Sequence, residues 1–533
     1  MSMFEAEYWS LYDDAWLWIV IVSFIIAFVL AFGIGANDVA NSFGSSVGAK
    51  VLSLRQACIL GTIFETLGAI LIGSKVSDTI RKGIISVELF PNGTEKEFMM
   101  GNMAALSGSC IWMLVATFLK LPVSTTHSIV GATLGFSLVA HGSKGVNWKQ
   151  LGLIVGSWFS SPILSGAIST GLFYLIYKFV LTKAKPLEPG LKLLPIFYGL
   201  TIAVNFFSIF YKGSSLLKFN KIPLYGTFIL TFGSAIIVAL LVRLFVVPWQ
   251  RKKILEKAQG IYLQKAEEGK EDHEIEYDIK YSNKNYADVI GNQTYEVKAS
   301  EKNSISMVSS GELTPSQISL GTKSDIVLVS ASDKDIDMLG AKGKDSEAAE
   351  GEDKAAIARR NVKDSLETQG LFSFLQVLTA VFGSFAHGGN DVSNAIGPLV
   401  AIWITATTGS AAQKAPVPIW ILLVGGMGIS LGLWILGRRV MKTLGEDLTK
   451  ITPTSGFCIE VGSALTVILA SNIHIPISTT HCKVGSVVFV GWFRSREAVD
   501  WKLFRNIIIA WFVTLPVAGG ISAALMAIFR EVI

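Results

Sequence analysis

Two short stretches decide how this sequence is interpreted: "GANDVANS" at residues 35–42 and "GGNDVSNA" at residues 388–395. Each places an asparagine and an aspartate at the end of a long apolar run. Because a carboxylate is costly to keep inside a bilayer, an acid in such a position indicates a functional site by default. A helix cap or a contact between helices is the alternative for one isolated motif. Two copies favour function.

The composition around these motifs is that of a membrane protein. Of the 533 residues, 51% are hydrophobic and 16% are charged, whereas soluble domains carry about 25% charged residues. Apolar runs of roughly 20 residues, the length that crosses a hydrocarbon core as a helix, recur along the chain. The sequence therefore predicts an all-α polytopic membrane protein with about 12 membrane segments.

The apolar segments fall into two groups on either side of a polar stretch. The predicted parts are an N-terminal tail, a first membrane repeat, a pair of inserted membrane helices, a central loop and a second membrane repeat, at residues 1–14, 15–178, 193–247, 251–370 and 371–530. Close to half of the charged residues lie in the central loop. This composition predicts a mostly disordered segment, whose first residues extend the preceding helix.

Lysine and arginine beside the spans set the predicted orientation. "WQRKK" (249–253) places the central loop in the cytoplasm, and both termini then lie outside the cell. The sequon at Asn92 falls on the outer side, where it is expected to carry a glycan. Lys75, Arg81 and Lys82 are exceptions, because they also fall on the outer side.

The two Asn-Asp motifs belong to an internal duplication. The elements that follow them are "PVSTTHSIVGA" (122–132) and "PISTTHCKVGS" (476–486), then "GVNWK" (145–149) and "AVDWK" (498–502), then "WFSSPILSG" (158–166) and "WFVTLPVAGG" (511–520). The same elements in the same order indicate an ancestral repeat. The predicted orientation makes the two repeats inverted, as in secondary transporters.

Each Pro-Ser-Thr-Thr-His element joins two apolar segments through a very short connection. Each pair of segments is either two full spans with a tight turn or a re-entrant hairpin with its polar tip inside the membrane. The tip sequence favours re-entry, because proline ends one helix and Ser124, Thr125 and Thr126 are good N-caps for the next. Such a tip offers free N–H groups to an anion.

The facing repeats would bring together carboxylates, amides and hydroxyl groups. No arginine or lysine lies in the motif cores, and Lys483 is the nearest. Neutral donors suit an anion that must leave again, since a permanently held polyanion favours arginine. Phosphate still carries O–H donors that a carboxylate accepts, whereas sulfate would meet an unpaired negative charge. The same oxygens are hard ligands that suit sodium.

Two further acids and four histidines complete the polar set. Glu65 and Glu460 lie in apolar segments at positions that are not repeat equivalents. They are predicted to serve an ion site or coupling, with a bond to a neighbouring helix as the alternative.

The paired His127 and His481 are expected to orient the tips. His387 and His474 lack counterparts and are interpreted as structural.

The stretches "GANDVANSFG", "LPVSTTHSIVGATLGFSLVA", "GGNDVSNAIGPL" and "PISTTHCKVGSVVFVGW" closely resemble the inorganic phosphate transporter family, and within it the animal type III sodium-dependent transporters. The resemblance covers about 20–248 and 370–530 but not the central loop. It implies sodium-driven uptake of inorganic phosphate at the plasma membrane. It also implies twelve membrane segments with re-entrant hairpins and a glycosylated first outer loop, which matches Asn92.

The resemblance also implies roles for individual residues. The expected phosphate ligands are Asp38, Asp391, Ser124, Thr125, Thr126, Ser478, Thr479 and Thr480. The expected sodium ligands are Asn37, Asn390, Asn41 and Asn394, with Glu65 and Glu460 needed for transport. The first tip reads "STTH" where relatives often have "SGTH", so the turn does not require that glycine.

These observations predict a sodium-coupled phosphate symporter that works by alternating access in a lipid bilayer. It is not expected to be an enzyme, to use a cofactor or to bind nucleic acid, and a homodimer is a further expectation. The alternatives are coupling to protons, another oxyanion as cargo, and a phosphate sensor that signals through the central loop. An intramembrane hydrolase is disfavoured, because an enzyme needs one Ser-His-Asp set and this chain duplicates everything.

Overall fold

The structure is a computed structural model. It describes residues 10–211, 219–267, 296–299, 305–308, 358–359, 362–473 and 475–532. The chain forms two compact units, one of Met1–Arg251 with Lys354–Ile533 and the other of Lys252–Asp353. The first unit, which we call the membrane unit, contains both Asn-Asp motifs and all the candidate site residues.

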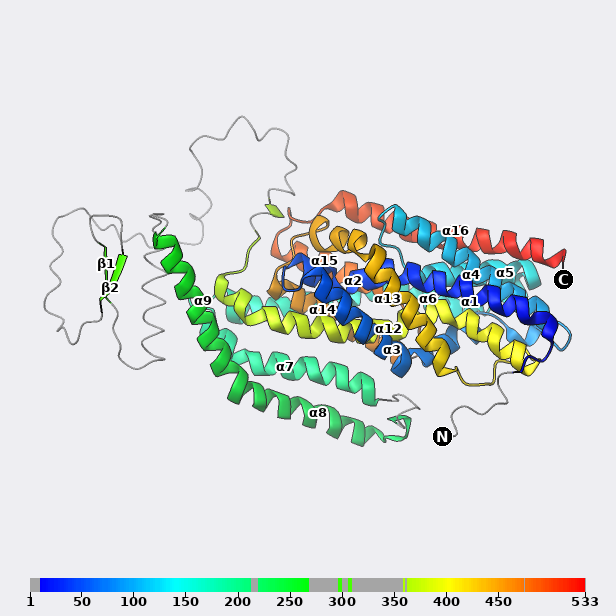
Figure 1. Ribbon diagram of the computed structural model, residues 1–533, viewed down its shortest axis with the longest axis horizontal. Helices are drawn as coiled ribbons and strands as arrows, with labels where there is room; N and C mark the ends of the chain where they lie inside the picture. The colour runs from blue at the N-terminus through cyan, green and yellow to red at the C-terminus, as the bar shows by residue number, and fades with distance from the viewer. Residues whose placement is uncertain are drawn as a thin grey trace, which may run out of the picture. The chain divides into compact units, whose positions relative to one another are not determined.

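The first part of the membrane unit is a series of long helices (Figure 1). It comprises α1 (Leu17–Ile34), the π-helical turn η3 (Gly35–Val39), α2 (Ala40–Gly48), α3 (Leu54–Lys82), α4 (Glu95–Phe118), α5 (Thr125–His141), α6 (Trp148–Ile176) and its continuation η6 (Tyr177–Leu181). The helices α7 (Leu187–Phe210), α8 (Leu224–Leu241) and α9 (Val247–Glu267) follow, with the turn η8 (Val242–Val246) before α9.

The second part begins after the central loop. It comprises α12 (Leu366–Thr408), α13 (Ile419–Lys442), the turn η9 (Thr443–Asp447), α14 (Pro453–Asn472), α15 (Thr479–Arg494) and α16 (Trp501–Arg530). Short 3-10 turns lie at η2 (Asp14–Trp16), η4 (Val87–Leu89), η5 (Gly142–Gly145) and η7 (Phe219–Lys221). The second unit holds an antiparallel hairpin of β1 (Glu296–Ala299) and β2 (Ile305–Val308).

The predicted membrane fold is confirmed. In the described part of the chain, 10 helices are long and apolar enough to cross a membrane, and the shorter α5 and α15 complete the expected set of segments. The expected helical extension into the central loop is α9, which ends at Glu267. The β1–β2 hairpin departs from a purely helical fold. The predicted domain boundaries and the disorder of the central loop stay predictions.

The Asn-Asp motifs lie within continuous helices, although in the sequence each of them stands at the end of an apolar run. The first motif forms the π-helical turn η3, which continues α1 into α2. The second lies well inside α12, an unbroken helix of 43 residues. Asparagine and aspartate weaken helices chiefly by bonding to their own backbone. Here their side chains bond to other segments instead, so the helices continue.

Two glycines in the motifs bring helices from opposite halves into backbone contact. A Cβ atom on Gly35 would lie 1.8 Å from the carbonyl oxygen of Ile429, and one on Gly388 would lie 2.3 Å from that of Glu65. Gly35 and Gly388 are repeat equivalents. Therefore α13 packs against the backbone of the first motif in the same way that α3 packs against the backbone of the second.

The tip helices show the same reciprocity. A Cβ atom on Gly131 of α5 would lie 2.5 Å from the carbonyl oxygen of Leu515 in α16, and one on Gly485 of α15 would lie 2.4 Å from that of Pro162 in α6. Each tip helix thus packs on the last helix of the other repeat. Reciprocal contacts of this kind are expected of two halves related by a two-fold axis, and the inverted orientation of the halves stays a prediction.

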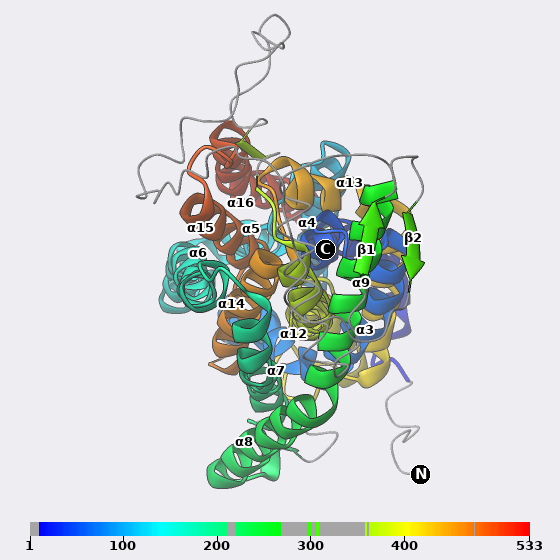
Figure 2. The same cartoon turned by 90° about the vertical axis from the view of Figure 1, so that its left-hand side faces the viewer.

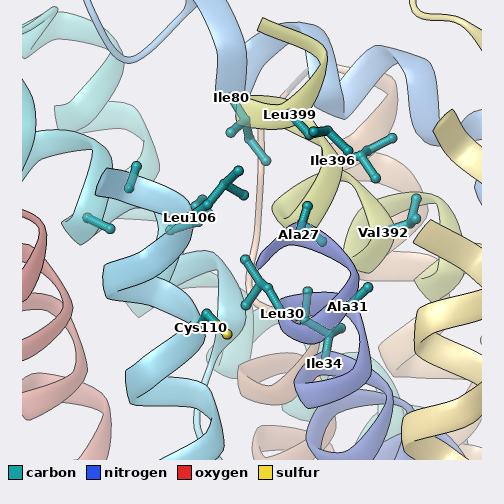
Figure 3. Close-up of a cluster of buried hydrophobic side chains, with 14 of the residues drawn as sticks. Ala27, Leu30, Ala31, Ile34, Ile80, Leu106, Cys110, Val392, Ile396 and Leu399 are labelled. Carbon is teal, nitrogen blue, oxygen red and sulfur yellow. The ribbon is translucent and has the colours of Figure 1, made fainter. Parts of the chain in front are cut away.

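An apolar core joins the two halves near the motifs (Figure 3). The side chains come from α1, α3, α4 and α12, and those labelled in the figure are Ala27, Leu30, Ala31, Ile34, Ile80, Leu106, Cys110, Val392, Ile396 and Leu399. All of them are buried. The two motifs are therefore held on elements that pack directly against one another.

The inserted helices lie at the edge of this bundle. α7 contacts α12 and α14, whereas α8 packs chiefly on α7, and Figure 2 shows α8 projecting beyond α7. Large apolar residues on α8, such as Ile237 and Leu240, are exposed, as expected of a surface that faces lipid. Their interpretation as an insertion stays a prediction.

The buried Arg81 accounts for part of the positive charge predicted on the outer side. Its guanidinium group bonds to Asp78 Oδ1 at 2.7 Å, to Gln413 Oε1 at 3.1 Å and to the carbonyl oxygen of Ala415 at 2.9 Å. The side chain is 1% exposed. Arg81 therefore joins the end of α3 to the segment before α13, and Asp78 balances its charge.

Replacing Gly35 by alanine should destabilise the protein, because the new methyl group would collide with a backbone carbonyl that no rotamer change can move. We expect a loss of about 3 kcal/mol or more, the upper part of the range for overpacked cores. The thermal unfolding midpoint of the purified protein measures this loss. Gly152→Ala in α6 is the matched control, since no atom of the described residues lies within 4 Å of its added Cβ. Equal midpoints for the two variants would contradict the proposed contact.

Candidate functional site

Two polar tips lie between paired helices, one between α4 and α5 and the other between α14 and α15. Ser124 is the N-cap of α5 and accepts a hydrogen bond from His127 N at 3.3 Å. Ser478 caps α15 in the same way, from His481 N at 3.1 Å. The cap predicted at the first tip is confirmed at Ser124, and Ser478 takes the equivalent position at the second tip. Each tip begins a helix inside the protein, where the first N–H groups favour negative charge.

The motif asparagines hold the tips in place. Asn37 Nδ2 donates to the carbonyl oxygen of Leu121 at 2.9 Å, and Asn37 Oδ1 accepts from Val123 N at 3.2 Å. Asn390 Nδ2 donates to the carbonyl oxygen of Ile477 at 3.1 Å. Val123 and Ile477 are repeat equivalents. Each motif therefore binds the backbone just before the tip of its own repeat.

The motif aspartates accept hydrogen bonds from the tip hydroxyls. Asp38 Oδ2 accepts from Thr125 Oγ1, and Asp38 Oδ1 accepts from Thr480 Oγ1 at 3.0 Å. Asp391 Oδ1 accepts from Thr479 Oγ1 at 3.1 Å. Asp38 thus bonds to both tips. The expected convergence of the two repeats is present in the structure.

The two tips also bond directly to each other. Thr126 Oγ1 donates to the carbonyl oxygen of Ile477 at 3.1 Å, and Thr480 Oγ1 donates to that of Val123 at 3.2 Å. Asn394 Nδ2 lies 3.4 Å from Thr126 Oγ1. In each tip the second threonine thus bonds to the backbone of the other tip, so the two tips are in direct contact.

Several oxygens at this site have no donor. Among the described residues, these buried atoms without a hydrogen-bond partner include Asp391 Oδ2, Asn390 Oδ1, Asn394 Oδ1 and Glu65 Oε2. Buried polar atoms are normally paired, so unpaired acceptors require an explanation. A bound cation supplies one, because carboxylate and amide oxygens are hard ligands. The donor set therefore fits sodium.

Glu65 and Glu460 differ in how they are paired. Glu65 Oε1 accepts from Ser384 Oγ at 2.9 Å, while Oε2 has no donor within the described part of the chain. Glu460 has partners on both oxygens, because Ser45 donates to Oε1 and Lys483 Nζ lies 2.5 Å from Oε2. Glu460 and Lys483 are each 1% exposed. Lys483, the cation nearest to the motifs, is thus engaged by a carboxylate.

Comparison with known proteins places this arrangement in a family. The model of the phosphate transporter family matches residues 34–522. The chain belongs to the phosphate transporter family. It is 45% identical to sodium-dependent phosphate transporter 1-A of Danio rerio, across 97% of this chain and 95% of that protein. It is 43% identical to sodium-dependent phosphate transporter 1 of Homo sapiens, across 97% of each chain.

A solved structure shares the fold as well. It is entitled "The sodium-dependent phosphate transporter", with a TM-score of 0.70 and 33% sequence identity. The similarity covers 97% of this chain and 100% of that one. The family resemblance inferred from the Asn-Asp and Ser-Thr-Thr-His motifs is therefore confirmed.

The paired histidines of this transporter lie directly behind the tips. His127 stacks on Trp158 and His481 stacks on Trp511, each with 3.6 Å between ring centroids. The two imidazoles are 4.4 Å apart. Trp511 Nε1 donates to the carbonyl oxygen of Pro122 at 3.2 Å. These contacts agree with a role in orienting the tips.

The structure adds partners that sequence reasoning missed. Trp158 and Trp511 open the last repeated element, so the duplication already marked them. Ser384 and Ser45 carried no comparable signal, because serine is common in membrane helices. His387 lies 3.0 Å from Ser42 Oγ through Nδ1, in line with a structural role.

Four of the predicted residues either lie outside the described part of the chain or already serve as helix caps. The side chain of Asn41 and the whole of His474 lie outside the described residues. Ser124 and Ser478 use their oxygens as helix caps, so as phosphate ligands they have only their hydroxyl protons to offer. The other predicted residues that the structure describes, apart from Glu460, lie at the tips, in the motifs or beside them. Their assignment to phosphate or sodium stays a proposal.

Proposed function

We propose that this chain imports inorganic phosphate across the plasma membrane together with sodium, by alternating access. The observation that carries the proposal is a set of buried carboxylates without a basic partner. Asp38, Asp391 and Glu65 form no ion pair within the described residues, whereas the one buried lysine there is bound to Glu460. Such charges are costly in a membrane unless a cation compensates them.

Sodium is better suited than a basic side chain to compensate these carboxylates, because a sodium ion can be released together with the phosphate. The free oxygens of Asp391, Asn390, Asn394 and Glu65 are its proposed ligands. Once sodium has reduced the negative charge, phosphate can enter beside Asp38 and Asp391. Its O–H groups donate to the carboxylates, while the threonine hydroxyls and N–H groups of the tips donate to its oxygens. Sulfate has no proton to donate and is disfavoured.

Coupling follows from this charge balance. Each ligand reduces the cost of burying the other, and linkage makes the effect reciprocal. The reciprocal contacts between the two halves support alternating access, since an exchange of equivalent contacts would open the site to the opposite side. Glu460 has a different proposed role. It balances Lys483 and holds α14, α15 and α2 together next to the site.

Uptake of labelled phosphate by cells that express the chain tests the proposal. We expect uptake in sodium buffer, little uptake when choline replaces sodium at fixed pH, and no competition from excess sulfate. Uptake that is indifferent to sodium but rises with acidity would contradict sodium coupling and favour protons. Inhibition by sulfate equal to that by unlabelled phosphate would contradict the proposed role of the carboxylates.

Replacing Glu65 by glutamine should weaken sodium binding more than phosphate binding. The change removes a charged oxygen to which no described residue donates a hydrogen bond. We expect the half-saturating sodium concentration to rise roughly tenfold. Uptake titrated with sodium at saturating phosphate measures it. Ser384→Ala removes only the hydrogen bond that orients Glu65, so its shift should be smaller. A rise confined to the phosphate half-saturation would contradict a sodium role.

The loop before α4 offers a test of orientation. Asn92 is exposed in a turn, and Thr94 Oγ1 of its sequon bonds to the carbonyl oxygen of Pro91 at 2.8 Å. We propose that this side faces the cell exterior and carries a glycan. Asn92→Gln should reduce the apparent mass to that of the enzymatically deglycosylated protein. A second sequon, Asn292-Gln-Thr, lies in the central loop on the proposed cytoplasmic side, so Asn292→Gln should leave the apparent mass unchanged. The reverse result would invert the proposed topology.

A further inference from the structure

A cavity of about 540 Å³ lies away from the transport site, where the chain leads into α12. Its walls come from the end of α6 with η6, the start of α12 and the end of α15. The lining residues that matter here are Tyr177, Lys183, Lys363, Ser365, Phe493 and Arg494. The volume is in the range of pockets that bind small molecules.

The floor of this cavity is a fixed ion pair. Arg494 Nη2 lies 2.7 Å from Asp364 Oδ1 and 2.9 Å from the carbonyl oxygen of Lys363. Asp364 Oδ2 accepts from Thr454 N at 3.1 Å. Arg494 is 15% exposed and Asp364 is 1% exposed. Because Arg494 balances Asp364, this carboxylate does not oppose an anion in the cavity.

The rim of the cavity carries two uncompensated positive charges. Lys183 and Lys363 line the cavity and are exposed. Neither has an ion-pair partner among the residues that the structure describes. They belong to segments far apart in sequence, one after η6 and the other just before α12. Two free lysines above a neutral ion pair give the cavity a net positive charge.

The side walls are aromatic and accessible. Tyr177 is 46% exposed and Phe493 is 41% exposed, and their rings contact each other edge to face with 6.2 Å between centroids. The neighbouring Trp492 is also exposed. Exposed aromatic rings next to lysines are typical of the membrane interface. A ligand that fills the cavity would therefore meet both cations and apolar rings.

We propose that this cavity binds the headgroup of an anionic phospholipid that carries phosphate monoesters, from the leaflet on the side of the central loop. Basic pockets between membrane helices recognise such headgroups. The lysines would bind the phosphates, and the aromatic wall would contact the start of the acyl chains. A soluble anion would leave that wall without a partner. Only the choice of leaflet rests on the proposed orientation, and none of these residues belongs to the transport site.

Binding of fluorescent phosphatidylinositol bisphosphate to the purified full-length protein in neutral detergent tests this site. Fluorescence anisotropy would give its dissociation constant for the wild type and for Lys183→Gln/Lys363→Gln. We expect the double substitution to weaken binding roughly 30-fold, from the loss of two lysines near the headgroup. The matched control, Lys442→Gln/Lys502→Gln, removes the same charge from exposed positions outside the cavity and should leave binding within about threefold of the wild type.

Competition separates the sources of the phosphate group. Unlabelled phosphatidylinositol bisphosphate should displace the probe, whereas phosphatidylcholine and soluble inositol trisphosphate should not do so at the same concentration. The proposed site would be contradicted if both double variants bound the lipid equally weakly, or if the cavity variant bound it as tightly as the wild type. Displacement by inositol trisphosphate as effective as that by the lipid would overturn the assignment to a lipid. Transport is not measured, so failure of the proposed uptake would leave this result unaffected.

Discussion

Replacing Asp391 by asparagine should abolish sodium-dependent phosphate uptake while the protein still reaches the cell surface. Asp391 is buried, its Oδ1 is bound by Thr479, and its Oδ2 has no hydrogen-bond partner among the residues that the structure describes. An amide at this position would direct N–H groups toward the proposed sodium ligands and remove the charge that attracts the cation. We expect uptake to fall roughly 100-fold or more, since loss of a hydrogen bond to a charged group costs about 3 kcal/mol.

Initial rates of labelled phosphate uptake, normalised to biotinylated protein at the surface, measure this effect. Glu88→Gln is the matched control, because Glu88 is an exposed carboxylate in η4 without an ion pair in the described structure. It should transport as the wild type does. Asp38→Asn should also abolish uptake, because Asp38 accepts from the threonines of both tips. Normal uptake by Asp391→Asn at the surface would remove Asp391 from the site.

Breaking the ion pair between Glu460 and Lys483 should cause a large loss of stability that a second substitution restores. Both side chains are 1% exposed and lie 2.5 Å apart. Removing one partner leaves the other charge buried, which typically costs about 3–5 kcal/mol. Removing both charges can be neutral. We therefore expect Glu460→Gln and Lys483→Met to lower the thermal unfolding midpoint, and the double variant to recover most of it.

The thermal midpoints of the purified wild type, both single variants and the double variant form a complete cycle. Glu97→Gln provides the comparison for an accessible pair, because Glu97 lies 3.5 Å from Arg530, which is 48% exposed. Its loss should be below about 1 kcal/mol. A double variant that is as unstable as the worse single variant would show that packing, rather than charge pairing, stabilises this position.

The duplicated motifs predicted the site because each residue type carried its own chemical reason. Aspartate is costly in an apolar run, and Ser-Thr-Thr after proline is a helix start. The duplication in inverted orientation implied that the Asn-Asp motif and the Ser-Thr-Thr tip of each repeat would meet those of the other. The bonds of Thr125 and Thr480 to Asp38 agree with that reasoning. The resemblance to the phosphate transporter family rested on the same motifs, and the family match over residues 34–522 confirms it.

Other features depend on contacts that no local pattern encodes. The motifs looked like helix ends, but their polar side chains bond to the tips and leave the helical backbone intact. Lys483 lies one helical turn after Thr479, and only the packing of α14 against α15 brings Glu460 to it. Arg81 did not fit the predicted orientation, and its bonds to Gln413 and Ala415 join segments that are far apart in the sequence. Each of these outcomes was decided by tertiary contacts.

The central claim is that sodium and phosphate stabilise each other at one site formed by both repeats. Calorimetric titration of the purified protein with phosphate, in sodium and then in choline, tests it most directly. We expect sodium to increase phosphate affinity at least tenfold, and phosphate to increase sodium affinity by the same factor, as linkage requires. Phosphate affinity that is equal in both buffers would contradict the account.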